Sequence, residues 1–476
     1  GSPFLPSVDV PANGYQLYNL QAAGVYGPVS VQGEWSAAAV QRTGAGLAFV
    51  SGVYVFGSYF LTGEHRGYNR TRGSFDQVEV LRPVVRDEMV ADVPLGAFLS
   101  GGIDSSLIVA LMQAQSARPV RTFTIGFDDP RFDESQAAAA VAAHLGTAHT
   151  ELRVDGHDAL ALVPSLATIY DEPMADSSQL PTLLVSRLTR QHVTVAVSGD
   201  GGDELFGGYI QYRQRGSIAR LRSMVPSPLR GVAGATLGAV PFPGPGWLAT
   251  ASDRVAGRPL SAATRLGAML AADDERDVYL ALMAQTATPE RLTGPQVGDA
   301  HAQAVLAGPW LDGVDPLTAR MLFDAVSYLP DDILVKVDRA AMAYSLETRA
   351  PLLDHRVFEF AWRVPFTAKV RDGVGKLPLR RLLTRHVPTA LIDRPKRGFA
   401  VPLADWLRGP LRAWADDLLH ADRVTTSDVL DGAAVRSLWR QHLDGTADHA
   451  TLLWSVLSLC GHLRQMSATQ PNSATH

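Results

Sequence analysis

Short apolar segments alternate with helical repeats over residues 95 to 197. The apolar run from Leu95 to Leu99 has the pattern of a buried strand, and further strand candidates are Val120 to Ile125, Thr150 to Val154 and Val193 to Val197. Apolar residues at helical spacing occur between or after these strand segments, at Leu107 to Met112, Ser135 to Leu145 and Pro181 to Arg190. This alternation favours a doubly wound parallel α/β sheet. Ligands of such sheets bind at the carboxyl ends of the strands, so the segments that follow each strand are candidates for chemistry.

The segments on either side of this region have other patterns. Residues 1 to 75 are rich in glycine, lack lysine and contain alternating runs such as Val53 to Phe56, which indicate hairpins or a poorly ordered region of uncertain fold. A mostly helical insertion is expected over residues 211 to 325, with further helices up to the 460s. We therefore expect one large domain over residues 76 to 466 and a polar, disordered tail over residues 467 to 476.

Composition limits the class of protein. The 476 residues are 46% hydrophobic, enough for a large core, and the formal net charge of −5 gives no reason to expect nucleic-acid binding. Residues 43 to 63 are uncharged over the length of a membrane span, but their five glycines and their β-branched and aromatic residues favour strands over a membrane helix. No secretory signal is recognisable. The one cysteine, Cys460, lies in an apolar helical run, which fits a buried thiol in a reducing, cytoplasmic compartment.

The first candidate site is the segment Ser100 to Ser106, Ser-Gly-Gly-Ile-Asp-Ser-Ser, between an expected strand and an expected helix. Gly101 and Gly102 allow a close approach of the backbone, and the helix N-terminus favours a bound oxyanion. A carboxylate beside a phosphate repels it unless a divalent cation lies between them, so we interpret Asp104 as a Mg²⁺ ligand. A glycine turn followed by a serine-capped helix is the alternative.

A second segment, Val195 to Tyr209, repeats this pattern: a strand end and then a glycine turn with acidic residues. Asp200, Asp203 and Glu204 are expected at the same edge of the sheet as Asp104, close enough to share a cation with it. An acidic turn in solvent is the alternative for this segment.

Four segments together resemble the synthetase domain of glutamine-dependent asparagine synthetases: Ser100 to Ser106, Ser198 to Tyr209, Tyr328 to His355 and Arg394 to Leu403. The resemblance runs in order from about residue 76 to residue 463 and implies the adenine-nucleotide α-hydrolase type of fold, with Mg²⁺ as cofactor and ATP as substrate. It also implies the reaction. Adenylation of the aspartate side chain releases pyrophosphate, and ammonia then attacks to give asparagine and AMP.

The resemblance implies roles for individual residues. Asp104 and Asp203 match magnesium ligands, and Asp200, Glu347 and Lys396 match catalytic positions. Asp200 is important for forming the acyl-adenylate, Glu347 assists deprotonation of the attacking amine, and Lys396 steadies the adenylate and the departing pyrophosphate. For Lys396 a surface lysine is the alternative. The implied ATP-binding residues are Leu99, Ser100, Gly101, Gly102, Asp104, Ser105, Ser106, Ile125, Ser198 and Gly199.

The chain departs from the family at its N-terminal region. Glutamine hydrolysis requires a free N-terminal cysteine, and this chain has none before Cys460. We therefore expect nitrogen to come from free ammonia, a separate glutaminase or another amine. The departure leaves two alternatives open: an amide ligase or cyclase of β-lactam or lasso-peptide type, and an ATP-binding remnant without activity. A homodimer is expected by family analogy alone.

Overall fold

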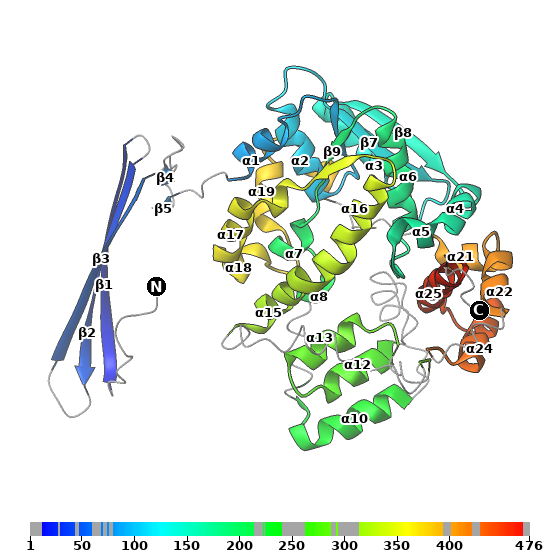
Figure 1. The fold of residues 1–476 in the computed structure, drawn as a ribbon. Helices are drawn as coiled ribbons and strands as arrows, with labels where there is room; N and C mark the ends of the chain where they lie inside the picture. The colour runs from blue at the N-terminus through cyan, green and yellow to red at the C-terminus, as the bar shows by residue number, and fades with distance from the viewer. Residues whose placement is uncertain are drawn as a thin grey trace, which may run out of the picture. The chain divides into compact units, whose positions relative to one another are not determined.

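The computed structural model divides the chain into two compact units, Gly1–Val80 and Leu81–His476 (Figure 1). It describes residues 12–26, 29–42, 47–59, 68–69 and 74–75 by their backbone, and residues 80–213, 222, 224–239, 262–286, 292–293, 314–393, 401–420 and 429–469 in more detail.

The first unit contains a three-stranded antiparallel sheet in the order β1-β2-β3. Its strands are β1 (Ala12–Tyr26), β2 (Val29–Arg42) and β3 (Leu47–Tyr59), and a two-stranded pair, β4 (Tyr68–Asn69) and β5 (Ser74–Phe75), follows. Leu20 pairs with Trp35, which pairs with Val53. The expected hairpins are confirmed, and the uncharged stretch contains a strand. Within the described helices, none combines the length and the hydropathy that crossing a bilayer requires.

The second unit is built on a five-stranded parallel sheet in the order β10-β9-β6-β7-β8. The strands are β6 (Leu95–Phe98), β7 (Arg121–Phe127), β8 (Ala148–Val154), β9 (Val195–Val197) and β10 (Glu347–Arg349). The doubly wound α/β class is confirmed, whereas β10 was not among the predicted strands. Because the chain proceeds from β6 toward β8 and later returns to β9 on the other side, the strand order reverses between β6 and β9. Such a reversal is where open α/β sheets bind ligands.

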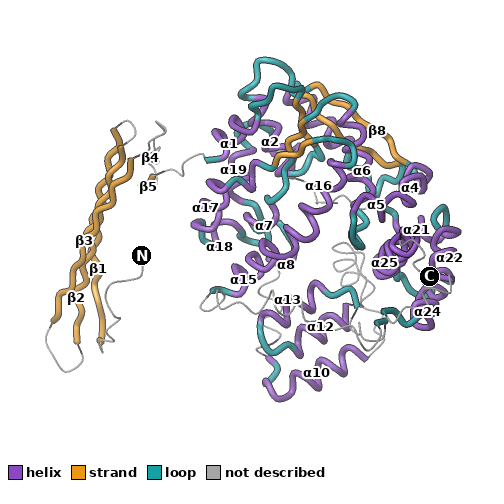
Figure 2. The backbone as a smooth tube through the Cα atoms, in the orientation of Figure 1, coloured by secondary structure: helices purple, strands orange, loops and turns teal. Residues whose placement is uncertain are grey.

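Helices cover both faces of this sheet (Figure 2). On β7, Phe123, Ile125 and Phe127 belong to the apolar core that contains α6 (Gln179–Arg190). A Cβ on the intervening Gly126 would instead contact Ser135, the first residue of α3 (Ser135–Leu145). Side chains alternate between the faces of a strand, so α6 and α3 lie on opposite faces. Helix α2 (Ile103–Gln113) packs beside α3, and α16 (Val335–Met342) packs beside α6.

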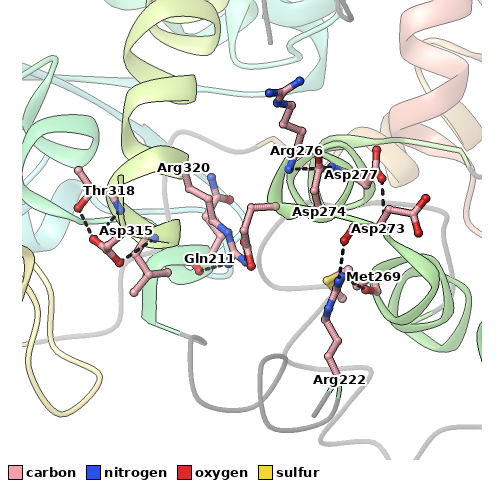
Figure 3. Close-up of polar contacts among 12 residues, drawn as sticks. Gln211, Arg222, Met269, Asp273, Asp274, Arg276, Asp277, Asp315, Thr318 and Arg320 are labelled. Atoms are coloured by element: carbon pink, nitrogen blue, oxygen red, sulfur yellow. Dashed lines mark hydrogen bonds and ion pairs between the residues drawn. The ribbon is translucent and has the colours of Figure 1, made fainter. Parts of the chain in front are cut away.

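The expected helical insertion is confirmed in its described parts, α10 (Ser227–Ala239), α12 (Ala262–Ala271), α13 (Glu275–Met283) and α15 (Pro316–Phe323). Asp274 and Asp315 accept backbone N–H groups at the starts of α13 and α15 (Figure 3). The Arg320 side chain, 4% exposed, forms an ion pair of 2.6 Å with Glu275 and thereby joins α15 to α13.

The C-terminal helices α21 (Leu403–Arg408), α22 (Arg412–His420), α24 (Gly432–Leu443) and α25 (Ala450–Thr469) extend the same core. Trp454 and Cys460 of α25 are buried in it, which confirms the buried thiol. Helix α25 continues to Thr469, three residues into the segment for which the sequence predicts a tail. Residues 470–476 lie outside the described part of the chain.

Candidate active site

The loop between β6 and α2 is held by its own serine hydroxyls. Ser100 Oγ lies 2.9 Å from Ser105 Oγ and accepts a hydrogen bond of 3.3 Å from the Gly102 N–H. Gly101 has φ of +70°, and a Cβ there would lie 2.8 Å from backbone atoms of α3, so glycine is required on both grounds. The loop therefore delivers the N-terminus of the 11-residue helix α2 to the carboxyl edge of the sheet.

The glycine turn after β9 lies directly against this loop. A Cβ on Gly199 would lie 2.8 Å from the Ser105 amide nitrogen, and a Cβ on Gly202 would lie 2.5 Å from Asp104 Oδ1. Gly201, with φ of +91°, precedes the short helix α7 (Gly202–Phe206). The two segments that the sequence singled out, about 95 residues apart, thus meet at the point where the strand order reverses.

A lysine lies between the two predicted metal ligands. Lys376 Nζ donates a hydrogen bond to Asp104 Oδ2 and lies 2.8 Å from Asp203 Oδ1. The lysine is only 6% exposed. Burial opposes the charge on Lys376, but the attraction of the two carboxylates outweighs it and raises the pKa of the lysine above its usual value. Asp104 and Asp203 therefore converge on one cation, and in this structure that cation is an ammonium group of the protein.

Glycines leave the space through which the Lys376 side chain reaches Asp104 and Asp203. Lys376 immediately precedes α19 (Leu377–Leu383), and its N–H donates to Phe206 O at 2.9 Å. A Cβ on Gly208 would collide with the Asp203 carboxylate and with Lys376 Cε. A Cβ on Gly375 would collide with Gly207 O. Gly208 is therefore explained by the passage of the lysine side chain, whereas Gly207 has φ of +71° and its Cβ would collide with Val370.

A cavity of about 230 Å³ lies beside the loop that follows β9. Its lining combines the ends of β9 and β10 with one side of α16 and the residues before it. The lining residues are Ser198, Asp200, Leu334, Val337, Asp338, Thr348, Arg349 and Ala350. The Ser198 N–H donates to Arg349 O at 2.8 Å and so continues the pairing of the two strands into the cavity wall.

A second buried lysine neutralises the acids behind this cavity. Lys336, 6% exposed, forms an ion pair with Asp176, and the charge of Asp200 also stabilises its ammonium form. Burial opposes ionisation of Asp176, but Lys336 outweighs this and lowers the pKa of Asp176. Burial and the charge of Asp176 raise the pKa of Asp332 to about 6. The cluster thus contains an acid that titrates close to neutral pH.

Glu204 is the second acid with a pKa near neutral. It is 2% exposed and accepts a hydrogen bond from the Tyr209 hydroxyl. Burial and the neighbouring charge of Asp203 raise the pKa of Glu204 to about 7.

The remaining predicted residues lie in different surroundings. Leu99 and Ile125 are 1% and 3% exposed, and Ser106 is fully buried, so none of the three presents a side chain at the surface in this structure. The Glu347 side chain is 56% exposed and lies 2.7 Å from the Arg349 guanidinium. Because Glu347 begins β10, level with Val195, the structure does not bring it to the carboxyl edge with the acidic loops. Lys396 lies outside the described residues.

Asp104 and Asp203 have the chemistry of a magnesium site. In the part of the chain that the structure describes, no three His, Cys, Asp or Glu side chains are arranged to hold a metal ion. Magnesium commonly binds through one or two carboxylates together with substrate phosphates, so a pair of converging carboxylates fits an ion that arrives with a nucleotide.

Comparison with known proteins defines the class of protein. A family model described as asparagine synthase matches residues 78–468, a range that contains the sheet, both glycine loops, the lysines and the cavity. The chain therefore belongs to the asparagine synthase family, which confirms the resemblance found in the sequence. No glutaminase domain is recognised in its N-terminal region.

Individual relatives show the same extent of similarity. A Mycobacterium bovis protein, provisionally named an asparagine synthetase (glutamine-hydrolyzing), is 37% identical over 395 residues, covering 80% of this chain and 56% of the relative. Asparagine synthetase (glutamine-hydrolyzing) 1 of Bacillus subtilis is 29% identical, covering 78% and 56%. The enzyme of that name from Bos taurus is 24% identical, covering 82% and 55%. The chain thus spans little more than half the length of these relatives. A second family model, described as phosphate-selective porin O and P, matches residues 7–88.

Proposed function

We propose that this chain is an ATP-dependent ligase that adenylates the side-chain carboxylate of aspartate, releases pyrophosphate, and transfers nitrogen to give asparagine and AMP. The proposal rests mainly on one observation: two glycine loops from β6 and β9 touch at the reversal of the sheet, and their acids Asp104 and Asp203 converge on one cation. Membership of the asparagine synthase family supports it.

The loop after β6 is proposed to bind the triphosphate of ATP. The amide groups at the start of α2 and the Ser100 and Ser105 hydroxyls are donors at one edge of the sheet. Asp104 and Asp203 would hold Mg²⁺, which would neutralise the negative charge that accumulates when a carboxylate approaches a polyphosphate. Lys396 is proposed to add a positive charge for the departing pyrophosphate.

The cavity provides for the carboxylate and the nitrogen donor. Its volume of about 230 Å³ suits a small molecule and not a polymer. Asp200 lines it, and an aspartate there can accept the proton that an amine must lose when it attacks the adenylate. Glu347 is the second proposed base. This role would require the exposed β10 residue to approach the cavity that Thr348 and Arg349 already line.

We further propose that the nitrogen donor is free ammonia, a separate glutaminase or another amine. We further propose that the protein works in a reducing cytoplasm and that it forms a homodimer.

The experiment measures pyrophosphate release from ATP and Mg²⁺ with a panel of carboxylates, and amide formation with ammonium, glutamine and other amines. We expect release to depend on aspartate, and asparagine to form from ammonium but not from glutamine. Release with a different carboxylate would assign a natural-product ligase instead. No release with any member of the panel would leave an ATP-binding remnant.

Two variants test the role of the acids. Asp104→Asn is expected to lower pyrophosphate release by about 100-fold or more, the scale found when one group that stabilises developing charge is removed. Asp92→Asn changes an exposed acid that precedes β6 and is the matched control, with activity expected to be unchanged. Circular dichroism checks that both variants are folded. Full activity of a folded Asp104→Asn would contradict the metal-ligand role.

A further inference from the structure

The contacts of Lys376 place a protein cation at the position that the two acids would offer to a metal. Its ammonium group contacts oxygen atoms of Asp104 and Asp203 together, at 2.8 Å in the second case. Both carboxylate side chains are mostly buried, 14% and 15% exposed. Like charges this close repel, so the pair needs a positive charge between its members whenever the protein is folded.

We propose that Lys376 is an exchangeable counter-cation: it occupies the position between Asp104 and Asp203 when no metal nucleotide is bound, and it leaves that position when the metal nucleotide binds. The inference deepens the proposed function, because it concerns the same nucleotide site. Its consequence is that Lys376 competes with a divalent ion, so that metal alone binds weakly and binds well only together with a nucleotide.

Competition follows from the size and charge of the two cations. Magnesium binds carboxylate oxygens at about 2.0–2.1 Å, closer than an ammonium does, and two positive charges on the same pair of oxygens repel. One of the cations must therefore leave. Lysine is suited to this because its charge is carried on a flexible four-carbon stem, and a displaced ammonium can bind phosphate as a point charge.

The surroundings of Lys376 allow its side chain to move while its ammonium group stays close to the site. The backbone of Lys376 is fixed by its hydrogen bond to Phe206 O, while Gly208 leaves open the space beside Cε. The stem can thus rotate about a fixed origin, and the released ammonium stays at the edge of the sheet where the α2 N-terminus would receive phosphate.

The experiment measures Mn²⁺ binding without nucleotide by electron paramagnetic resonance. Lys376→Met is expected to bind Mn²⁺ about tenfold more tightly or better than the wild type, because a competing charge a few Å away is removed. Lys369→Met removes another buried lysine and is the matched control, with affinity unchanged. Adding Asp104→Asn to Lys376→Met should abolish the gain. A folded Lys376→Met with wild-type affinity would overturn the proposal.

A second measurement uses the wild type, since Lys376→Met leaves two buried carboxylates together and can fail to fold. The chain has four lysines, Lys336, Lys369, Lys376 and Lys396, so isotope-labelled lysine gives few side-chain signals in an NMR spectrum. Mg²⁺ with the α,β-methylene analogue of ATP should shift the Lys376 signal, and Mg²⁺ alone should shift it little. An unchanged Lys376 signal with bound analogue would refute the exchange. Neither measurement requires turnover, so failure of the ligase reaction is a separate result.

Discussion

Lys369 is a buried cation whose removal should stabilise the fold. The residue ends α18 (Phe366–Lys369), is 2% exposed, and its Nζ lies 4.9 Å from the centre of the Trp362 ring. Among the described residues, no carboxylate lies within ion-pair distance of it. Burial lowers the pKa of Lys369 from 10.5 to about 8.

The shift sets the size and the pH dependence of the effect. A fall of about 2.5 pKa units corresponds to about 3 kcal/mol of folding free energy, and the contact with Trp362 offsets about 1 kcal/mol of it. Lys369→Met keeps the aliphatic contacts and removes the charge, so we expect a gain of about 2 kcal/mol at pH 7. Between pH 8 and 10.5 the unfolded chain binds more protons at this lysine, so wild-type stability rises with pH and the advantage of the variant declines.

Urea unfolding of both proteins at pH 7 and at pH 10 measures this difference. The gain should be present at pH 7 and largely absent at pH 10. Arg371→Met removes an exposed cation nearby and is the control, with a change within about 0.5 kcal/mol. A gain of the same size at both pH values would refute the reasoning, because a packing effect does not titrate.

Three further predictions concern the site and the core. Gly208→Ala should weaken binding of magnesium nucleotide in a calorimetric titration and lower the free energy of unfolding by about 1–3 kcal/mol, because the added Cβ would collide with Asp203 and Lys376. Gly231→Ala is the control: its Cβ meets open space, so neither effect is expected. Glu204→Gln should gain stability relative to the wild type as pH rises from about 4.5 to 7. The raised pKa of Glu204 makes the wild type lose stability over this pH range, and glutamine does not titrate. Chemical denaturation at several pH values measures the growing difference in unfolding free energy between the two proteins. Cys460, whose pKa is raised to about 11 by burial, should not react with a thiol reagent at pH 8 until the protein is unfolded.

The elements that the sequence predicts well are those with a local pattern. Strands β6 and β9 are short apolar runs, β7 alternates apolar with small or polar residues, and α3 begins and ends at the predicted residues, Ser135 and Leu145. Strand β10 has no such pattern: its sequence, Glu-Thr-Arg, is polar and three residues long, and its pairing with β9 alone makes it a strand. Its register with β9, which pairs Glu347 with Val195, places Glu347 at the start of the strand and away from the acidic loops.

The two glycine loops of the candidate site could be predicted from the sequence, whereas the position of Lys376 between their acids could not. Two glycine turns after apolar strands predict the edge at which we propose that a nucleotide binds, because strand ends of a parallel sheet share one edge. The partner of Asp104, Lys376, lies 272 residues away, and no local pattern connects the two. Two signals could have found it: lysine is rare in this chain, and this one follows Gly-Val-Gly.

The wide separation of these charges along the chain has a consequence for biosynthesis. Asp104 and Asp203 leave the ribosome long before Lys376 does, so a nascent chain that has already made both acidic loops still lacks the charge that allows them to pack together. The proposed nucleotide site is therefore expected to form late, after α19 has been made. Fragments that end before this helix should bind nucleotide poorly even if their sheet has formed.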